Sequence, residues 1–104
     1  MIKVIVGYRL KVGMDIQPVL IKLRSYAMTF SGFVSAENLV NAQDNTIFAL
    51  VYTWENIENW KTWENTKIRK QILQEAEKLL REQPRVTIYN VVPTTGWSYV
   101  RSDS

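Results

Sequence analysis

The chain has 104 residues, of which 13 are Lys or Arg and 10 are Asp or Glu, so its net charge of +3 is small. A chain of this length forms one domain with a single hydrophobic core. It contains no cysteine and no histidine. This excludes disulfides, thiolate metal sites and a thiol nucleophile, and it removes the usual general base and the usual haem ligand. No carboxylate cluster has the spacing of a calcium loop, so we expect neither a metal nor a bound cofactor.

The basic residues are scattered among acidic ones, with one dense cluster at Lys67, Arg69 and Lys70. At the expected start of a helix this charge opposes the macrodipole, so we interpret it as a solvated face, with an anionic ligand as the alternative. Nucleic-acid binding requires a denser basic stripe with interleaved aromatics. No apolar stretch approaches the ~20 residues that span a bilayer, and the start lacks a signal-peptide pattern. These features predict a cytoplasmic protein that binds neither nucleic acid nor membrane.

The first half of the chain shows three periodic segments. Alternating apolar residues predict a strand over residues 2–11. Asp15 is the expected cap of a helix whose apolar spacing continues to Phe30 and which ends at Gly32. Residues 33–40 and 47–54 are predicted strands separated by a turn rich in Asn and Asp, which indicates an antiparallel hairpin.

The second half adds helices and a final strand. Asn56 is the expected cap of a helix, and a second cap at Asn65 predicts a break, after which an apolar stripe runs to Leu80. Residues 86–92 are the last predicted strand, closed by Pro93. The element order predicts an α+β fold of the ferredoxin-like βαββαβ type with an antiparallel sheet, formed by residues 1–93.

Two helices cover only one face of such a sheet, yet residues 47–54 and 86–92 are apolar on both faces. A second apolar face without a cover predicts a homodimer. The tail, residues 94–104, has the alternation of a short strand at residues 96–100. We expect it to dock on the partner protomer, or alternatively to fold back on its own sheet.

Three of the four tryptophans lie between residues 54 and 63. Ile57, Trp60 and Trp63 recur every three residues and therefore share one helical face, which we expect to be buried. This face is the wall of either a core or a pocket.

Three stretches resemble the antibiotic biosynthesis monooxygenase (ABM) domain family: residues 8–13, residues 30–37 with a Gly-Phe step, and residues 52–63 with a Trp-Glu followed by an aromatic helix. The resemblance covers about residues 2–92. It implies a dimeric α+β barrel with a pocket between the helices and the sheet. Members of this family include cofactor-independent oxygenases of quinol-like compounds, haem-degrading enzymes and proteins of no known activity. In the haem-degrading branch, Trp63 fits the site tryptophan, but Leu73 and Tyr8 stand where a histidine and an asparagine are needed.

The leading hypothesis is therefore a cofactor-independent monooxygenase acting on a small aromatic or quinol-like compound, whose substrate anion itself reduces dioxygen. Such an enzyme excludes water and stabilises the anion through nearby donors. The candidate catalytic residues are Trp63, Tyr8 and Arg9, and Arg9 is expected to lower the pKa of the substrate phenol. The candidate substrate-binding residues are Trp60, which would stack on the ring, together with Tyr52 and Asn38.

Each candidate has a plainer explanation. Aromatic residues at helical spacing are more often core than pocket, which applies to Trp60 above all. Tyr8 shares a strand face with apolar residues, and Arg9 and Glu37 form a cross-strand pair or separate surface charges. The rival class is a non-catalytic dimer that binds a small apolar molecule or has only a structural role. A third class is a protein interaction module that uses its sheet face for a different partner.

Overall fold

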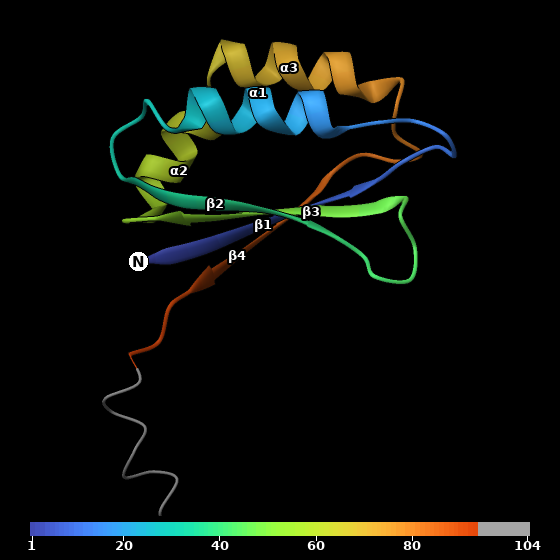
Figure 1. Ribbon diagram of the computed structural model, residues 1–104. Coiled ribbons are helices and arrows are strands. Elements are labelled where there is room, and N and C mark those ends of the chain that lie inside the picture. Colours follow the sequence, from blue (N-terminus) through green and yellow to red (C-terminus); the bar gives the residue numbers. More distant parts are fainter. Residues whose placement is uncertain (94–104) are drawn as a thin grey trace, which may run out of the picture.

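The computed structural model describes residues 1–93, which form one antiparallel sheet and a layer of helices. All the helices lie on one face of the sheet (Figure 1). The strands follow the order β2-β3-β1-β4. This is the predicted ferredoxin-like α+β fold. The elements are β1 (Ile2–Arg9), α1 (Gln17–Ala27), β2 (Phe33–Val40), β3 (Ile47–Trp54), α2 (Ile57–Glu64), α3 (Lys67–Glu77) and β4 (Arg85–Asn90).

Strand β1 is central and sets the register of its neighbours. It pairs with β3 from Ile2 opposite Trp54 to Arg9 opposite Ile47, and with β4 from Ile2 opposite Asn90. Paired residues share a face and consecutive residues alternate. One face, which we call the inner face, packs against the helices and contains the buried strand residues Ile2, Val4, Val6, Tyr8, Ala36, Leu50, Tyr52 and Trp54.

Helix α1 begins and ends slightly differently from the prediction. Its N-cap is Ile16, although the Asp15 carboxylate still accepts a hydrogen bond from the Gln17 backbone N–H at 3.0 Å. The helix ends at Ala27, and Phe30 lies in the turn that follows, half-buried against the core. Gly32 has a φ of 83°, and a Cβ there would overlap the Asn59 side chain. Glycine is therefore required where this turn enters β2.

The predicted break in the second helical region separates α2 from α3. Asn56 caps α2 as expected, because its side-chain oxygen accepts from the Asn59 backbone N–H at 2.9 Å. The cap of α3 is Thr66, whose hydroxyl accepts from the Arg69 backbone N–H at 3.3 Å. Asn65 instead ends α2. The prediction of a break was correct, and its capping residue was one position early.

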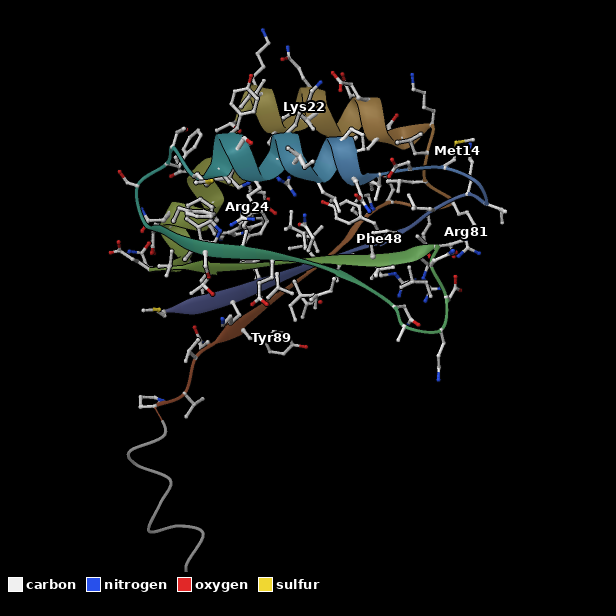
Figure 2. All side chains as sticks on the ribbon, in the orientation of Figure 1. Met14, Lys22, Arg24, Phe48, Arg81 and Tyr89 are labelled. Atoms are coloured by element: carbon white, nitrogen blue, oxygen red, sulfur yellow. The ribbon has the colours of Figure 1, made fainter. Side chains whose placement is uncertain are left out.

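The other face of the sheet, which we call the outer face, is left uncovered by the described part of the chain. Alternation places Ile5, Ala49 and Val51 there, together with Leu39 and Tyr89, which are 49% and 54% exposed. Figure 2 shows Tyr89 on the side away from the helices and Phe48 on the helix side. The predicted second apolar face exists. The docking predicted for the tail falls on residues 94–104, outside the described residues.

Within residues 1–93, no helix is long and apolar enough to cross a membrane.

Candidate active site between the helices and the sheet

Helix α2 places two tryptophans directly over β3. Because Asn56 caps the helix two residues after the strand ends, α2 turns back over the inner face, and both Trp60 and Trp63 are 0% exposed. The Trp60 and Tyr52 ring centroids are 5.4 Å apart, and the Trp63 and Phe30 centroids are 5.2 Å apart. Burial of both tryptophans confirms the expected buried face.

Ile57, the third expected member of that face, is 36% exposed and lies at its rim. It is the first residue of α2 and so lies at the end of the helix nearest the turn. The buried part of the face therefore consists of the two tryptophans.

The indole nitrogens of this cluster lack hydrogen-bond partners. The Nε1 atoms of Trp54, Trp60 and Trp63 are buried and unpaired among residues 1–93. Leaving a buried donor unsatisfied costs about 1–3 kcal/mol, and most buried polar groups in native proteins are paired. The interior beneath α2 therefore has hydrogen-bonding capacity that the chain itself does not use.

Arg69 brings a positive charge into the same region. Its residue is 7% exposed, and its guanidinium carbon lies 5.2 Å from the centroid of the Trp60 ring. This geometry is a cation–π contact. The Arg69 Nη1 atom donates to the Glu64 backbone oxygen at a long 3.5 Å. None of the ion pairs formed within residues 1–93 includes Arg69.

The solvated face predicted for the basic cluster is therefore wrong for Arg69, although Lys67 and Lys70 are exposed. Arg69 belongs to the buried side of α3 with Ile72 and Ala76. The spacing of these three residues is helical, which is the sequence signal that identifies Arg69 as inward-facing.

The hydroxyls of Tyr8 and Tyr52 reach the same interior. Burial, and secondarily Tyr52, raises the pKa of Tyr8 well above its usual value. Burial raises the pKa of Tyr52 to about 12, with the Trp63 indole N–H and Arg69 acting in the opposite direction. The indole nitrogen is near enough to have this effect, but it does not reach hydrogen-bonding geometry.

The charge of Arg69 lowers the pKa of both tyrosines, so the guanidinium lies within electrostatic reach of both hydroxyls. Because burial outweighs it, both phenols stay protonated near neutral pH. Tyr8 and Tyr52 are thus hydrogen-bond donors and not bases.

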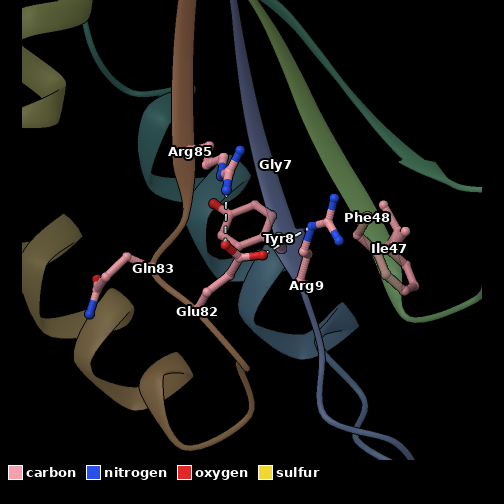
Figure 3. Close-up of a pocket in the computed structure, with 8 residues that line it drawn as sticks. All are labelled: Gly7, Tyr8, Arg9, Ile47, Phe48, Glu82, Gln83 and Arg85. Carbon is pink, nitrogen blue, oxygen red and sulfur yellow. Dashed lines mark hydrogen bonds and ion pairs between the residues drawn. The ribbon is translucent and has the colours of Figure 1, made fainter.

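Arg9 lies apart from this cluster. It follows Tyr8 on β1 and so projects to the outer face, where its Nε lies 3.0 Å from the Glu82 Oε1 (Figure 3). The other Glu82 oxygen pairs with the Arg85 Nη2 at 3.3 Å. These residues border a pocket of about 170 Å³ that is also lined by Tyr8, Ile47 and Phe48. The cation beside the tryptophans is Arg69 and not Arg9.

Asn38 also lies away from the tryptophans. It pairs with Leu50 and is exposed, whereas Tyr52 pairs with Ala36 two residues further along the hairpin. Asn38 lines a shallow pocket of about 270 Å³ beside Leu20 of α1. Of the six predicted site residues, the structure brings four together: Tyr8, Tyr52, Trp60 and Trp63.

Within residues 1–93, no group of three or more Asp or Glu side chains is arranged to hold a metal ion. The donors of the cluster are hydroxyl, indole and guanidinium N–H and O–H groups. Such groups bind the oxygen of an anion rather than a cation.

The sequence matches no protein-family model and no curated protein. The structure, however, is similar to many solved structures. An antibiotic biosynthesis monooxygenase has a TM-score of 0.79 at 17% identity, over 89% of this chain and 100% of that chain. A Deinococcus radiodurans protein named provisionally as an antibiotic biosynthesis monooxygenase has a TM-score of 0.80 at 11% identity, over 89% and 94%. A conserved protein from Methanosarcina mazei Go1 has a TM-score of 0.77 at 16% identity, over 88% and 92%. The protein therefore has the ABM-domain fold that the resemblance in its sequence implied.

Proposed function

We propose that the protein is a cofactor-independent monooxygenase acting on a small aromatic, quinol-like compound. One observation carries the proposal. Beneath α2, the rings of Trp60 and Tyr52 lie 5.4 Å apart, and Trp63 and the protonated Tyr8 are buried in the same core. Similarity of fold to proteins named as monooxygenases supports the same chemistry.

The reaction converts a ring CH₂ group, activated by a neighbouring phenol or enol, into a carbonyl. Written as a balance, R₂CH₂ + O₂ gives R₂C=O + H₂O. Two C–H bonds break, one oxygen atom enters the product and the other leaves as water. The substrate supplies all the electrons that reduce dioxygen, so the chemistry requires no flavin and no metal.

The residues have separate roles in this account. Trp60 and Trp63 hold the ring and exclude water, which strengthens the electrostatic interactions inside the site. The hydroxyls of Tyr8 and Tyr52 donate to the substrate oxygen where negative charge develops. Because their pKa values are raised, they do not remove the substrate proton. The substrate therefore loses its proton to bulk solvent before the ring is enclosed, which favours substrates that are already acidic near neutral pH.

Phe30 is the partly buried aromatic residue that covers Trp63. This half-buried ring packs on Trp63 from the turn between α1 and β2. It is attached to no helix or strand, so displacing it disturbs little of the sheet.

Oxygen consumption by the purified protein tests the proposal. A panel of anthrones and quinols is supplied without flavin or metal, with chelator present. We expect uptake that falls at least about tenfold in Tyr52→Phe, because one donor to the developing oxyanion is lost. Tyr26→Phe, which alters an exposed tyrosine on α1, is the matched control. No uptake across the panel, or equal uptake in Tyr52→Phe and Tyr26→Phe, contradicts the proposal.

A second candidate is a dimer that binds a small aromatic molecule without turning it over. The complete burial of Trp60 and Trp63 favours this non-catalytic class in its purely structural form, because rings buried in this way also form an ordinary core. Saturable binding of a panel compound without oxygen uptake distinguishes this candidate from the oxygenase.

We also propose that two copies associate through their outer faces. Support comes from the partly buried apolar strip of Ile5, Ala49 and Val51 and from its exposed neighbours Leu39 and Tyr89, which no described helix covers. Apolar surface left open in this way is typical of association surfaces. Such a pair of facing sheets would be the dimeric α+β barrel that the family resemblance implied.

A further inference from the structure

Arg69 is the only charged residue that is buried among residues 1–93. Burying an ionised group is costly unless it is paired and hydrogen-bonded. Every acidic group found in an ion pair within these residues belongs to another cation, since Glu82 pairs with Arg9 and Arg85, and Glu75 with Lys22. The guanidinium of Arg69 therefore has no carboxylate to neutralise it.

The hydrogen bonds of Arg69 leave most of its capacity unused. A guanidinium has five N–H donors, and the side chain makes one long bond, to the Glu64 oxygen. Its remaining stabilisation in the described residues comes from the face of Trp60. The indole donors of Trp60 and Trp63 are unpaired in the same region. Positive charge and unpaired indole donors thus lie in one region, where the Glu64 backbone oxygen is the acceptor that the described residues supply to the Arg69 side chain.

The surroundings of this charge define what would complement it. Trp60 and Tyr52 present their rings at 5.4 Å from each other, beside the guanidinium. The charged or titratable groups acting on the Tyr8 and Tyr52 hydroxyls are these two tyrosines and Arg69. The chemistry of a flat ring bearing one ionised oxygen complements these groups, because such a ring offers both a stacking face and an acceptor.

We propose that Arg69 is the anion receptor of this site and that it selects aromatic compounds in their phenolate or enolate form over the neutral form. The inference deepens the proposed oxygenase function, since the anion is the species that reduces dioxygen. The binding step itself does not depend on turnover. A purely structural Arg69 would affect only stability.

A phenol that reports its own ionisation provides the test. Para-nitrophenol has an ionisation near neutrality that is visible as colour, and it lacks the activated CH₂ needed for turnover. Its absorbance is titrated against pH with and without excess protein. We expect the apparent pKa of the bound phenol to fall by about one unit or more, which is at least about a tenfold preference for the phenolate.

Three variants separate the receptor from a structural role. Arg69→Met retains much of the stem volume without the charge and is expected to abolish the shift. Arg69→Lys keeps a charge and is expected to retain part of it. Lys70→Met removes the same charge from the exposed side of α3 and is expected to leave it unchanged. Para-nitroanisole, the neutral methyl ether, should bind equally to the wild type and to Arg69→Met.

The inference is overturned if para-nitrophenol does not bind, if it binds without a shift in its ionisation, or if Arg69→Met keeps the shift. If Arg69→Met does not fold, Arg69→Lys is compared with Lys70→Met instead. The inference is then overturned if both variants lower the pKa of bound para-nitrophenol as much as the wild type does. A shift dependent on Arg69 without oxygen uptake by any quinol supports the receptor and contradicts the oxygenase. Oxygen uptake that is unchanged in Arg69→Met supports the oxygenase and contradicts the receptor.

Discussion

The two faces of one sheet have similar sequences and different surroundings. On β3, Leu50 and Tyr52 face inward and are almost completely buried, whereas their neighbours Ala49 and Val51 face outward and are only partly covered. Both sets are apolar. The difference arises because all the helices lie on one side (Figure 1). An apolar strand face thus indicates that something will cover that face. The number and placement of the helices then indicate whether the cover comes from the chain itself.

The faces also differ in chemistry. The inner face has three unpaired indole donors, two raised tyrosine pKa values and one buried guanidinium. At its rim, the outer face has charges that satisfy one another, Glu82 with Arg9 and Arg85. Unused polar capacity is therefore concentrated on the inner face, and we assign ligand chemistry to that face and association to the other.

The largest expected effect follows from opening the inner face. Trp60→Ala should lower the free energy of unfolding by about 3–5 kcal/mol, because it removes a fully buried ring that packs on both Tyr52 and Arg69. Chemical denaturation measures it. Val12→Ala, at an exposed turn position, should change stability by no more than about 0.5 kcal/mol. A loss below about 1 kcal/mol for Trp60→Ala would show that the cluster is not tightly packed.

A charge on the outer face should break the proposed dimer without unfolding the protomer. Ile5→Asp would bury an unpaired carboxylate between facing sheets, and we expect the dissociation constant to rise about a hundredfold or more. Sedimentation of wild type and variant measures this effect. Val12→Asp places the same charge in an exposed turn and should leave association unchanged. A monomeric wild type, or an Ile5→Asp dimer of undiminished affinity, would argue against association through this face.

Alkaline pH should reveal the buried tyrosines. An unfolded tyrosine ionises near pH 10, but Tyr52 in the folded state ionises at about 12. Between these values the folded state binds more protons than the unfolded state, so stability falls as pH rises. The expected slope is about 1.4 kcal/mol per pH unit from Tyr52. Tyr8 adds to it in the same direction.

Tyr52→Phe should reduce this alkaline slope, and Tyr26→Phe, at an exposed site, should not. Urea unfolding at a series of pH values gives the comparison. Identical slopes in the two variants would mean that the Tyr52 hydroxyl is not held away from water.

The smallest effect concerns the cap that positions Arg69. Thr66→Ala removes the acceptor for the Arg69 backbone N–H and should cost about 1 kcal/mol, while Thr66→Ser should cost less. Thermal unfolding measures both. If Asn65→Ala cost more than Thr66→Ala, then α3 would begin one residue earlier than we describe.

The fold was largely predictable because its signals are local and repeated. The hairpin strands were predicted with the bounds that the structure has, 33–40 and 47–54, since alternation and an Asn-rich turn agree. The first and last strands of the chain, β1 and β4, were predicted to end too late, because apolar residues continue past the last ladder pair of each. A strand ends where its hydrogen-bonded partner strand ends, and the position of that partner cannot be read from a single sequence.

The candidate site was only partly predictable. The tryptophans follow helical spacing, so their burial was foreseeable. Arg9 was selected because its positive charge would lower the pKa of a substrate phenol, yet strand alternation sends Arg9 and Tyr8 to opposite faces. Arg69 was interpreted by the density of charge around it rather than by its spacing from Ile72 and Ala76. Whether a phenol, a cation and an indole meet depends on how α3 crosses the sheet, which the chain order alone does not specify.

Isotopic labelling of the product tests the central claim most directly. The purified protein is incubated with an anthrone under dioxygen labelled with oxygen-18, in unlabelled water, and the mass of the product is measured by mass spectrometry. A cofactor-independent monooxygenase should give a quinone that has gained one heavy oxygen atom, at a rate that Tyr52→Phe lowers and Tyr26→Phe does not. A product without heavy oxygen, or no product above the rate without protein, would contradict the account and leave the inner face as a binding site or a core.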